Sequence, residues 1–181
     1  MGKDGKGTLL FVVQKHKATT LHYDLRLQIG DVMPSWAIPK GPTLDNTVKR
    51  LAIHTDNHLI EYRQFEGVIP EGEYGAGTVM IWDEGMYSPE LEISKGVRRE
   101  VTGKEEAQRV AGNEYREGNL KFILYGKKLQ GSFGLVRTAG LAGNKDSWLL
   151  IKHSDKFCKK GYDANKYDFS AASGLSFAQI K

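Results

Sequence analysis

The sequence predicts a mainly β protein, an antiparallel barrel or sandwich of about eight short strands. Short runs rich in Val, Ile, Leu and aromatic residues recur along the chain, and several alternate apolar with polar residues. Glycine accounts for 21 of the 181 residues, above the roughly 7% of average proteins, and much of it lies between these runs. A helical pattern is found in one segment. These observations favour strands joined by tight turns.

The expected strands, in chain order, are residues 9–14, 21–28, 35–38, 50–55, 78–82, 120–124, 133–137 and 148–152. Turn signals separate them, at residues 29–31, 40–42, 70–72, 84–85 and 130–132. The expected helix covers residues 103–115, where Ala107, Val110, Ala111 and Tyr115 recur at helical spacing and Gly112 weakens the pattern.

The length fits one domain with short extensions. We expect a flexible N-terminus over residues 1–8, a barrel domain over residues 9–155 and a C-terminal tail over residues 156–181. After Lys152 the apolar pattern fades into Lys, Ser, Ala and Gly, so the last dozen residues are expected to be loosely held.

Composition excludes several classes of protein. The formal net charge is +4 and the pI is near 9.0, a mild bias towards polyanions. Cys158 is the single cysteine, which excludes an internal disulfide framework and a zinc site built on several thiolates. The apolar stretches are too short to span a bilayer, and the N-terminus lacks the apolar core of a signal peptide. We therefore expect a cytoplasmic monomer with no membrane partner.

Residues 21–28 (LHYDLRLQ) carry the clearest chemical pattern. In a strand, the apolar residues share one face, and His22, Asp24, Arg26 and Gln28 share the other. Backbone positions two apart on one face are roughly 6.5–7 Å apart, which lets a histidine nitrogen and an aspartate oxygen converge on one ion. Arg26 would follow, suited to a bidentate grip on an anion. The same alternation is also typical of the solvent-facing side of an antiparallel sheet.

Further titratable residues surround this segment. His16 lies six residues upstream and can fold back over the strand, while His54 and His58 follow another expected strand. Nearby in the sequence are three more polar side chains, Lys40, Arg50 and Tyr62. An anion site needs such cations, and a hydrolytic site needs a group that titrates near neutral pH, as histidine does.

Six motifs in this sequence match one known family. They are residues 11–16 (FVVQKH), 21–27 (LHYDLRL), 35–42 (SWAIPKGP), 65–79 (FEGVIPEGEYGAGTV), 131–137 (GSFGLVR) and 148–153 (WLLIKH). Together they closely resemble the 3′-phosphoesterase domain of bacterial DNA ligase D, over roughly residues 9–155. The resemblance implies a compact antiparallel β-barrel with one or two short helices and a concave active-site groove.

The resemblance also implies an activity. It indicates a manganese-dependent hydrolase that acts at 3′ ends of nucleic acid during DNA repair by non-homologous end joining. Such an enzyme removes a 3′-terminal ribonucleoside, leaving a 3′-phosphate, and then hydrolyses that phosphate to a 3′-OH. The implied partners are the 3′ end of a DNA or RNA/DNA primer–template, and a DNA ligase and a polymerase of end joining. Zn²⁺ or Co²⁺ could substitute for Mn²⁺ at a site of nitrogen and oxygen ligands.

The resemblance further implies a role for individual residues. The implied metal ligands are His16, His22 and Asp24. The implied phosphate and transition-state contacts are Arg26, Lys40, Arg50 and His58, with Tyr62 assisting. We expect His58 to act as an imidazolium donor or as a general acid to the leaving 3′ oxygen. Lys152, which follows an apolar strand, is a further candidate phosphate contact.

One departure from the family concerns the N-terminal arm. In the fused enzymes, this arm carries an Arg-Asp pair and a glutamate that contribute to activity. Lys3 and Asp4 are a poor substitute for that pair. Phosphate removal is therefore expected more firmly than ribonucleoside removal.

Several other features have two interpretations. The glycine-rich residues 72–77 lack the ending of a phosphate-binding loop, so we interpret them as a turn, with Tyr74 near the groove. Three large aromatic residues could stack on bases or belong to the core: Trp82, Tyr87 and Trp148. Four lysines could contact a nucleic-acid backbone or face solvent: Lys127, Lys128, Lys159 and Lys160.

Two rival functions remain open at this stage. An Fe(II) oxygenase also uses His-x-Asp on a strand with a distant histidine, here His22 and Asp24 with His58 or His153. It would leave His16 and the basic residues to be explained separately. A non-catalytic nucleic-acid-binding barrel would keep a basic groove, but it would not need two histidines and an acid to converge.

Overall fold

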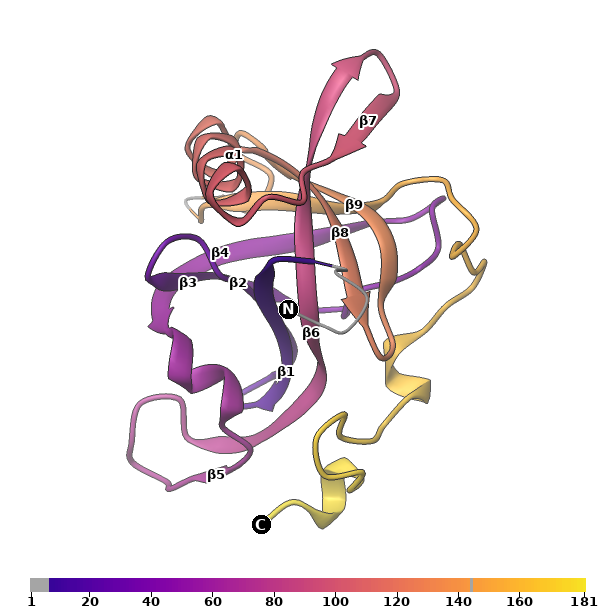
Figure 1. The fold of residues 1–181 in the computed structure, drawn as a ribbon. Helices are drawn as coiled ribbons and strands as arrows, with labels where there is room; N and C mark the ends of the chain where they lie inside the picture. Colours follow the sequence, from indigo (N-terminus) through magenta and orange to yellow (C-terminus); the bar gives the residue numbers. More distant parts are fainter. Residues whose placement is uncertain (1–6, 144) are drawn as a thin grey trace.

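The computed structural model describes residues 7–143 and 145–181, and eight of its strands form a closed ring (Figure 1). Around the ring the order is β1 (Leu9–Lys17), β2 (Leu21–Leu27), β3 (Val32–Ile38), β4 (Lys49–Leu59), β10 (Ser147–Lys152), β9 (Gln130–Arg137), β8 (Asn119–Gly126) and β6 (Gly77–Ser94). β6 also pairs with β1, and all these pairings are antiparallel. The mainly β class and the barrel-like antiparallel arrangement are confirmed.

The eight expected runs match the eight ring strands, but β6 is much longer than expected. Its 18 residues pair with β5 (Gly67–Ile69) and β1 from the start of the strand to Tyr87, and with β8 and β7 (Val97–Glu100) from Gly85 to its end. The sequence interpretation placed a turn at Gly85, which instead lies inside the strand. A Cβ there would stand 2.3 Å from the Tyr125 carbonyl oxygen, so the close approach of β8 requires glycine.

The helix α1 (Lys104–Glu117) lies where the sequence predicted one. It follows Gly103 and ends at Gly118, which adopts the left-handed conformation common after helices (φ 75°). Its apolar side, including Ala107, Val110 and Ala111, is buried, and the helix packs against β8 and β6. Within the described residues, no helix combines the length and apolar character needed to cross a membrane.

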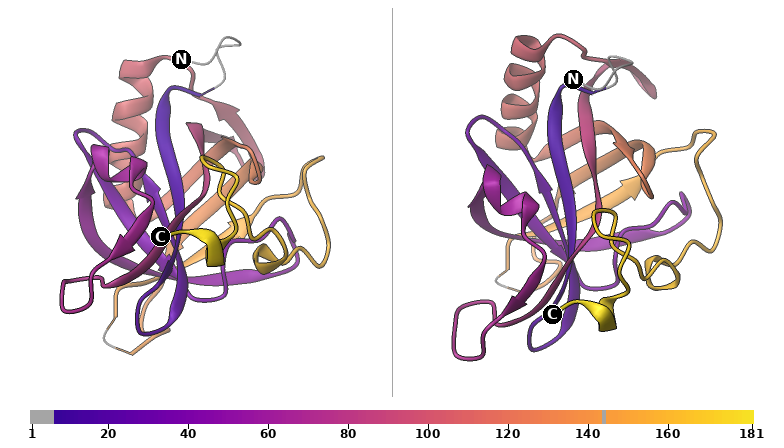
Figure 2. Two further views of the ribbon diagram at one scale, coloured as in Figure 1. Left: turned by 90° about the horizontal axis from the view of Figure 1, so that it is seen from below. Right: turned by 60° about the horizontal axis from the view of Figure 1, so that its bottom comes forward.

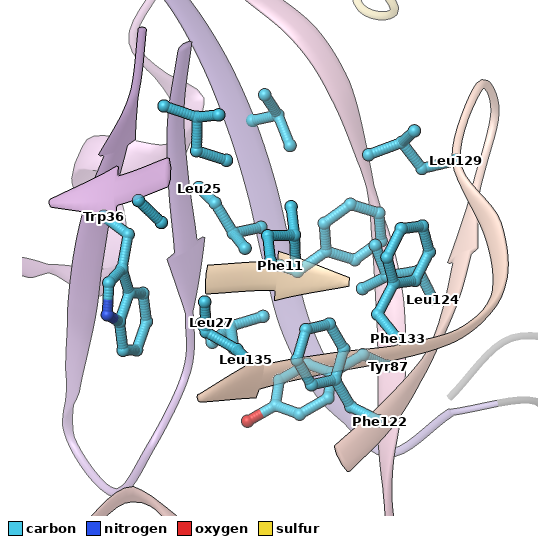
Figure 3. Close-up of a cluster of buried hydrophobic side chains, with 14 of the residues drawn as sticks. Phe11, Leu25, Leu27, Trp36, Tyr87, Phe122, Leu124, Leu129, Phe133 and Leu135 are labelled. Atoms are coloured by element: carbon cyan, nitrogen blue, oxygen red, sulfur yellow. The ribbon is translucent and has the colours of Figure 1, made fainter. Parts of the chain in front are cut away.

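The main core fills the interior between the ring strands and α1 (Figure 3). Phe122 of β8 stacks on Phe133 of β9, with ring centroids 6.1 Å apart. Trp82, Tyr87 and Trp148 are at most 1% exposed. The interpretation of these three residues as core is therefore confirmed, and they cannot stack on bases in this arrangement.

The expected flexible N-terminus falls partly outside the described residues. Residues 1–6, including Lys3 and Asp4, are not described. Gly7 and Thr8 are described and buried, and the Thr8 N–H donates to the Tyr87 carbonyl at 3.0 Å. At these two positions the chain already lies against β6.

The C-terminal segment is packed, in contrast to the loosely held end expected from its composition. It runs along the outside of the ring, away from α1 (Figure 2). Tyr162, Ala164 and Ile180 are buried in the main core. Asp168 accepts a hydrogen bond from Lys15 at 2.9 Å, and Asn165 accepts one from Tyr23 at 2.7 Å. These anchors are too widely spaced in the sequence to form a recognisable period.

Two lysines that the sequence offered as candidate nucleic-acid contacts instead help to hold this C-terminal segment in place. The Lys128 ammonium donates to the carbonyls of Trp82 and Phe169, and lies 4.1 Å from the centroid of the Phe169 ring. Lys159 donates to the Tyr167 hydroxyl at 2.7 Å. Both lysines therefore have partners within the protein.

Truncating Ile180 tests whether this segment stabilises the barrel. We expect Ile180→Ala to lower the free energy of unfolding by about 2 kcal/mol, because it removes buried apolar surface. Leu175→Ala is the matched control. Its side chain is 40% exposed, and we expect a change below about 0.5 kcal/mol. Urea unfolding followed by tryptophan fluorescence measures both, and equal, negligible changes would contradict the packed arrangement.

Candidate metal centre and active-site pocket

A pocket of about 660 Å³ lies on the side of strands β1–β4 opposite the main core. The 3₁₀ helix η1 (Ile60–Gln64) and the loop between β5 and β6 complete its walls. It brings together six of the residues singled out from the sequence: His16, His22, Asp24, Arg26, His58 and Tyr62.

The alternation along β2 places the polar row in this pocket. Tyr23, Leu25 and Leu27 belong to the core, so the intervening side chains emerge on the other face. That face is not open to solvent, since Asp24 is 6% exposed and Arg26 is 3% exposed. The alternative of an ordinary solvent-facing sheet is therefore contradicted. Buried charges of this kind need specific partners.

Two histidines converge on one carboxylate at one end of the pocket. His16 and His22 are directly opposite each other across the β1–β2 pair. The Asp24 Oδ2 atom lies 3.2 Å from His22 Nε2 and 3.7 Å from His16 Nδ1. One ligand atom from each residue lies within 4.8 Å of the others. The three side chains could therefore share a metal ion.

The outward ring nitrogens of both histidines face backbone carbonyls. His16 Nε2 lies 2.7 Å from the Gly75 oxygen, and His22 Nδ1 lies 3.3 Å from the Thr20 oxygen. Carbonyls only accept, so these contacts fix the proton of each neutral ring on the outward nitrogen. The inward nitrogens are then left with lone pairs directed towards Asp24. Such an arrangement fits a divalent cation with nitrogen and oxygen ligands.

The electrostatics of the cluster keep its carboxylate ionised. Burial alone would raise the pKa of Asp24, but the adjacent imidazoles of His16 and His22 and the charge of Arg26 hold that pKa well below its usual range. The hydrogen bond with Asp24 raises the pKa of His22 against the opposing effect of burial. The anionic form of Asp24, which a metal requires, is thus the stable one.

Arg26 is fixed beside this cluster by three side chains. Its Nε donates to Gln14 Oε1 at 2.6 Å, Nη1 lies 3.1 Å from His58 Nδ1, and Nη2 lies 3.4 Å from Asp24 Oδ2. Gln14 in turn donates to the carbonyls of Tyr62 and Phe65, each at 3.0 Å. A guanidinium has five N–H donors, so these contacts leave two of them without a hydrogen-bond partner among the described residues.

His58 and Tyr62 form the wall next to Arg26. Burial and the charge of Arg26 lower the pKa of His58, so the ring is neutral at pH 7. Because Arg26 can only donate, its bond to Nδ1 puts the His58 proton on Nε2. The opposite tautomer would instead donate to the Asp56 carbonyl, 3.0 Å away. Burial raises the pKa of Tyr62, whose hydroxyl therefore stays protonated.

Three residues expected at the site are not among those that line the pocket: Lys40, Arg50 and Lys152. Lys40 lies in the exposed turn after β3. Arg50 is on the same face of β4 as the core residue Ala52, away from the pocket.

Lys152 is fully buried and has its own partners. Its ammonium donates to Asp155 at 2.8 Å and to the carbonyls of Ser132 and His153 at 3.0 and 2.9 Å. The expectation that Lys152 contacts the phosphate is contradicted, because all three ammonium donors are satisfied elsewhere.

The sequence interpretation missed two contributors to the site. Gln14 is 0% exposed and links Arg26 to the wall formed by η1. Its spacing of two residues from His16 on β1 could have identified it, since both then share a face. Gly75 gave no such signal, because its role depends on a backbone carbonyl.

The sequence of the segment that forms this pocket matches a known protein family. Residues 14–137 match the family described as the DNA Ligase D 3′-phosphoesterase domain. This range contains the candidate metal ligands, Arg26, His58 and Tyr62.

Curated relatives cover most of the chain. The multifunctional non-homologous end joining protein LigD of Pseudomonas aeruginosa is 42% identical over 153 residues, or 84% of this chain. The LigD protein of Mycobacterium tuberculosis is 39% identical over the same length, and that of Mycolicibacterium smegmatis is 38% identical over 146 residues. The chain spans only 16–17% of the length of these relatives. By the extent of these matches, the chain belongs to the DNA ligase D 3′-phosphoesterase domain family.

Proposed function

We propose that this protein is a manganese-dependent phosphoesterase that hydrolyses a 3′-phosphate at a nucleic-acid end to a 3′-OH during DNA end repair. Removal of a 3′-terminal ribonucleoside is the accompanying activity, and a ligase and a polymerase of end joining are its partners. The observation that carries the proposal is the convergence of His16, His22 and Asp24 beside Arg26 in one pocket. Membership of the DNA ligase D family supports the choice of substrate.

The chain's own side chains suit a phosphate monoester. The two free N–H groups of Arg26 provide a fork for two phosphoryl oxygens, which is the geometry that guanidinium groups favour. His58 donates from Nε2, and the Tyr62 hydroxyl can donate to a third oxygen. These fixed donors stabilise charge that develops on the phosphoryl group. His58 is also placed to protonate the leaving 3′ oxygen.

His16, His22 and Asp24 would hold the divalent ion. When bound, such an ion supplies Lewis-acid polarisation of a phosphoryl oxygen and an activated water. A mixed nitrogen and oxygen set suits Mn²⁺ and also accepts Zn²⁺ or Co²⁺.

The direct test is an assay of 3′ ends with a panel of metals. The substrates are primer–templates that end in a 3′-phosphate or in a 3′-terminal ribonucleoside, incubated with Mn²⁺, Zn²⁺, Co²⁺ or Mg²⁺. We expect phosphate release with Mn²⁺ and none from His22→Ala. Release that is equally fast without added metal after chelation, or from His22→Ala, would overturn the proposal.

Removing the His58 ring should change both rate and pH profile. We expect His58→Ala to lower kcat/KM by roughly 10²–10⁴-fold, because it removes a donor to the reacting phosphate. His58 can give a proton to the leaving oxygen only from its protonated form, and its lowered pKa places that form below about pH 6.5. The activity of the parent relative to that of the variant should therefore rise as the pH falls towards that range. His58→Asn, which cannot titrate but can still donate, is the matched control. An unchanged rate with an unchanged acid limb would remove His58 from this role.

The structure gives little support to the Fe(II) oxygenase alternative. Its third ligand was expected to be His58 or His153, and neither belongs to the converging group in the described residues. His153 Nδ1 instead faces the Ser132 hydroxyl at 2.7 Å, away from the pocket.

A further inference from the structure

The loop between β5 and β6 carries an aromatic side chain at the mouth of the pocket. Tyr74 is 91% exposed although it lines the pocket. Figure 1 shows this loop, next to the β5 label, projecting from the ring. Among the described residues, Tyr74 makes no side-chain hydrogen bond and no ring contact. A large exposed ring of this kind is available for a ligand.

The loop is nevertheless held in place. The Glu73 N–H donates to the Pro70 carbonyl at 3.2 Å, and the Ala76 N–H donates to the Glu73 carbonyl at 3.1 Å. The Gly75 carbonyl lies 2.7 Å from His16 Nε2. Gly75 adopts φ 76°, a conformation that favours glycine and turns the chain back towards His16. Tyr74 is thus next in sequence to Gly75, whose carbonyl contacts the candidate metal ligand His16.

The pocket extends well beyond the space that a phosphate group needs. Its volume of about 660 Å³ lies in the range of sites for whole small molecules. Besides its polar residues, which include Glu73, the lining has the apolar side chains of Phe65 and Ile69 and the Tyr74 ring. Phe65 stacks on Tyr62 with centroids 5.5 Å apart, so this wall is rigid. A flat, largely apolar group attached to the phosphate fits such a surface.

We propose that Tyr74 stacks on the base of the 3′-terminal nucleotide whose phosphate is held at Arg26. This inference rests on the proposed function, because the phosphate end fixes where the nucleoside lies. Stacking on an aromatic ring accepts any base, since each base has a flat π face. Tyr74 is therefore a substrate-positioning residue that favours nucleic-acid ends over phosphate esters without a base.

The test compares two 3′-phosphate oligonucleotides that differ only in the terminal base, one natural and one abasic. We expect Tyr74→Ala to lower kcat/KM by about 5- to 100-fold on the natural end, mainly through KM, and to leave the abasic end within about twofold. Tyr74→Phe keeps the ring and should match the parent. Ile93→Ala, which truncates an exposed side chain on β6 outside the pocket, is the control. Equal losses on both substrates, or no loss on either, would overturn the inference.

A binding measurement separates this inference from the proposed activity. An oligonucleotide ending in 2-aminopurine 3′-phosphate reports stacking through quenching of its fluorescence, whether or not the phosphate is hydrolysed. We expect quenching with the parent and with Tyr74→Phe, and its loss with Tyr74→Ala. Quenching without hydrolysis would leave the stacking in place and reject the activity. Hydrolysis with unchanged quenching in Tyr74→Ala would reject the stacking alone.

Discussion

Replacing Asp24 with Asn should remove divalent-metal binding and phosphate release together. Asp24 supplies the negative charge of the candidate metal centre, and its lowered pKa keeps it ionised at neutral pH. Changing even an outer hydrogen-bond partner of a metal ligand costs about 10- to 100-fold in affinity or activity. We therefore expect Asp24→Asn to lose at least about 100-fold in both Mn²⁺ affinity and kcat/KM. Isothermal titration with Mn²⁺ and release of phosphate from a 3′-phosphate oligonucleotide measure the two effects.

Two further variants make the Asp24 result decisive. Asp24→Asn leaves the buried Arg26 without its carboxylate partner, which destabilises proteins by up to about 3–5 kcal/mol. His22→Ala removes a ligand without leaving a buried charge unpaired, so it should lose metal while remaining folded. Asp31→Asn changes an exposed carboxylate in the β2–β3 turn and should behave as the parent. If Asp24→Asn binds Mn²⁺ and releases phosphate at parental rates, the non-catalytic nucleic-acid-binding barrel becomes the better interpretation.

Replacing Arg26 with Lys should abolish most activity while leaving the metal centre intact. The guanidinium contacts Gln14, His58 and Asp24 through three different nitrogens, and these contacts use three of its five N–H groups. A single ammonium keeps the positive charge beside Asp24, but it cannot reproduce the planar fork. We expect kcat/KM to fall by roughly 10²–10³-fold, as when a preorganised transition-state donor is removed.

The measurement for Arg26→Lys pairs kinetics with metal titration. Mn²⁺ affinity should stay within about threefold of the parent, because the three ligands are untouched. Arg109→Lys is the matched control, since that guanidinium lies on the exposed side of α1. Parental activity would show that Arg26 does not contact the phosphate. Equal losses of metal and activity would show that Arg26 acts only by supporting Asp24.

Local periodicity was sufficient to predict the ring strands and part of the site. A period of two put His22, Asp24 and Arg26 on one face, and the structure places all three in the pocket. The family resemblance gave roles to His16, His58 and Tyr62, which also line the pocket. Periodicity and family resemblance both identified site residues whose pattern lies within a single strand or motif.

Other features depend on contacts between distant segments and left no local pattern. Lys152 and His153 were equally placed to face inward, and the Ser132 carbonyl of β9 together with Asp155 decides the partners of Lys152. Arg50 looked suitable by charge, but its face is set by the burial of Ala52. Ile180 belongs to the same buried cluster as residues of β1 and β2, more than 100 positions away in the sequence, so composition alone indicated a loose tail.

Diffraction from crystals soaked in Mn²⁺, collected at wavelengths on both sides of the manganese absorption edge, tests the central claim most directly. The account predicts one strong anomalous peak coordinated by His16 Nδ1, His22 Nε2 and an Asp24 oxygen, with the Arg26 guanidinium beside it. A peak at another place in the molecule would contradict the account. So would the absence of any peak while these three side chains keep only their mutual hydrogen bonds.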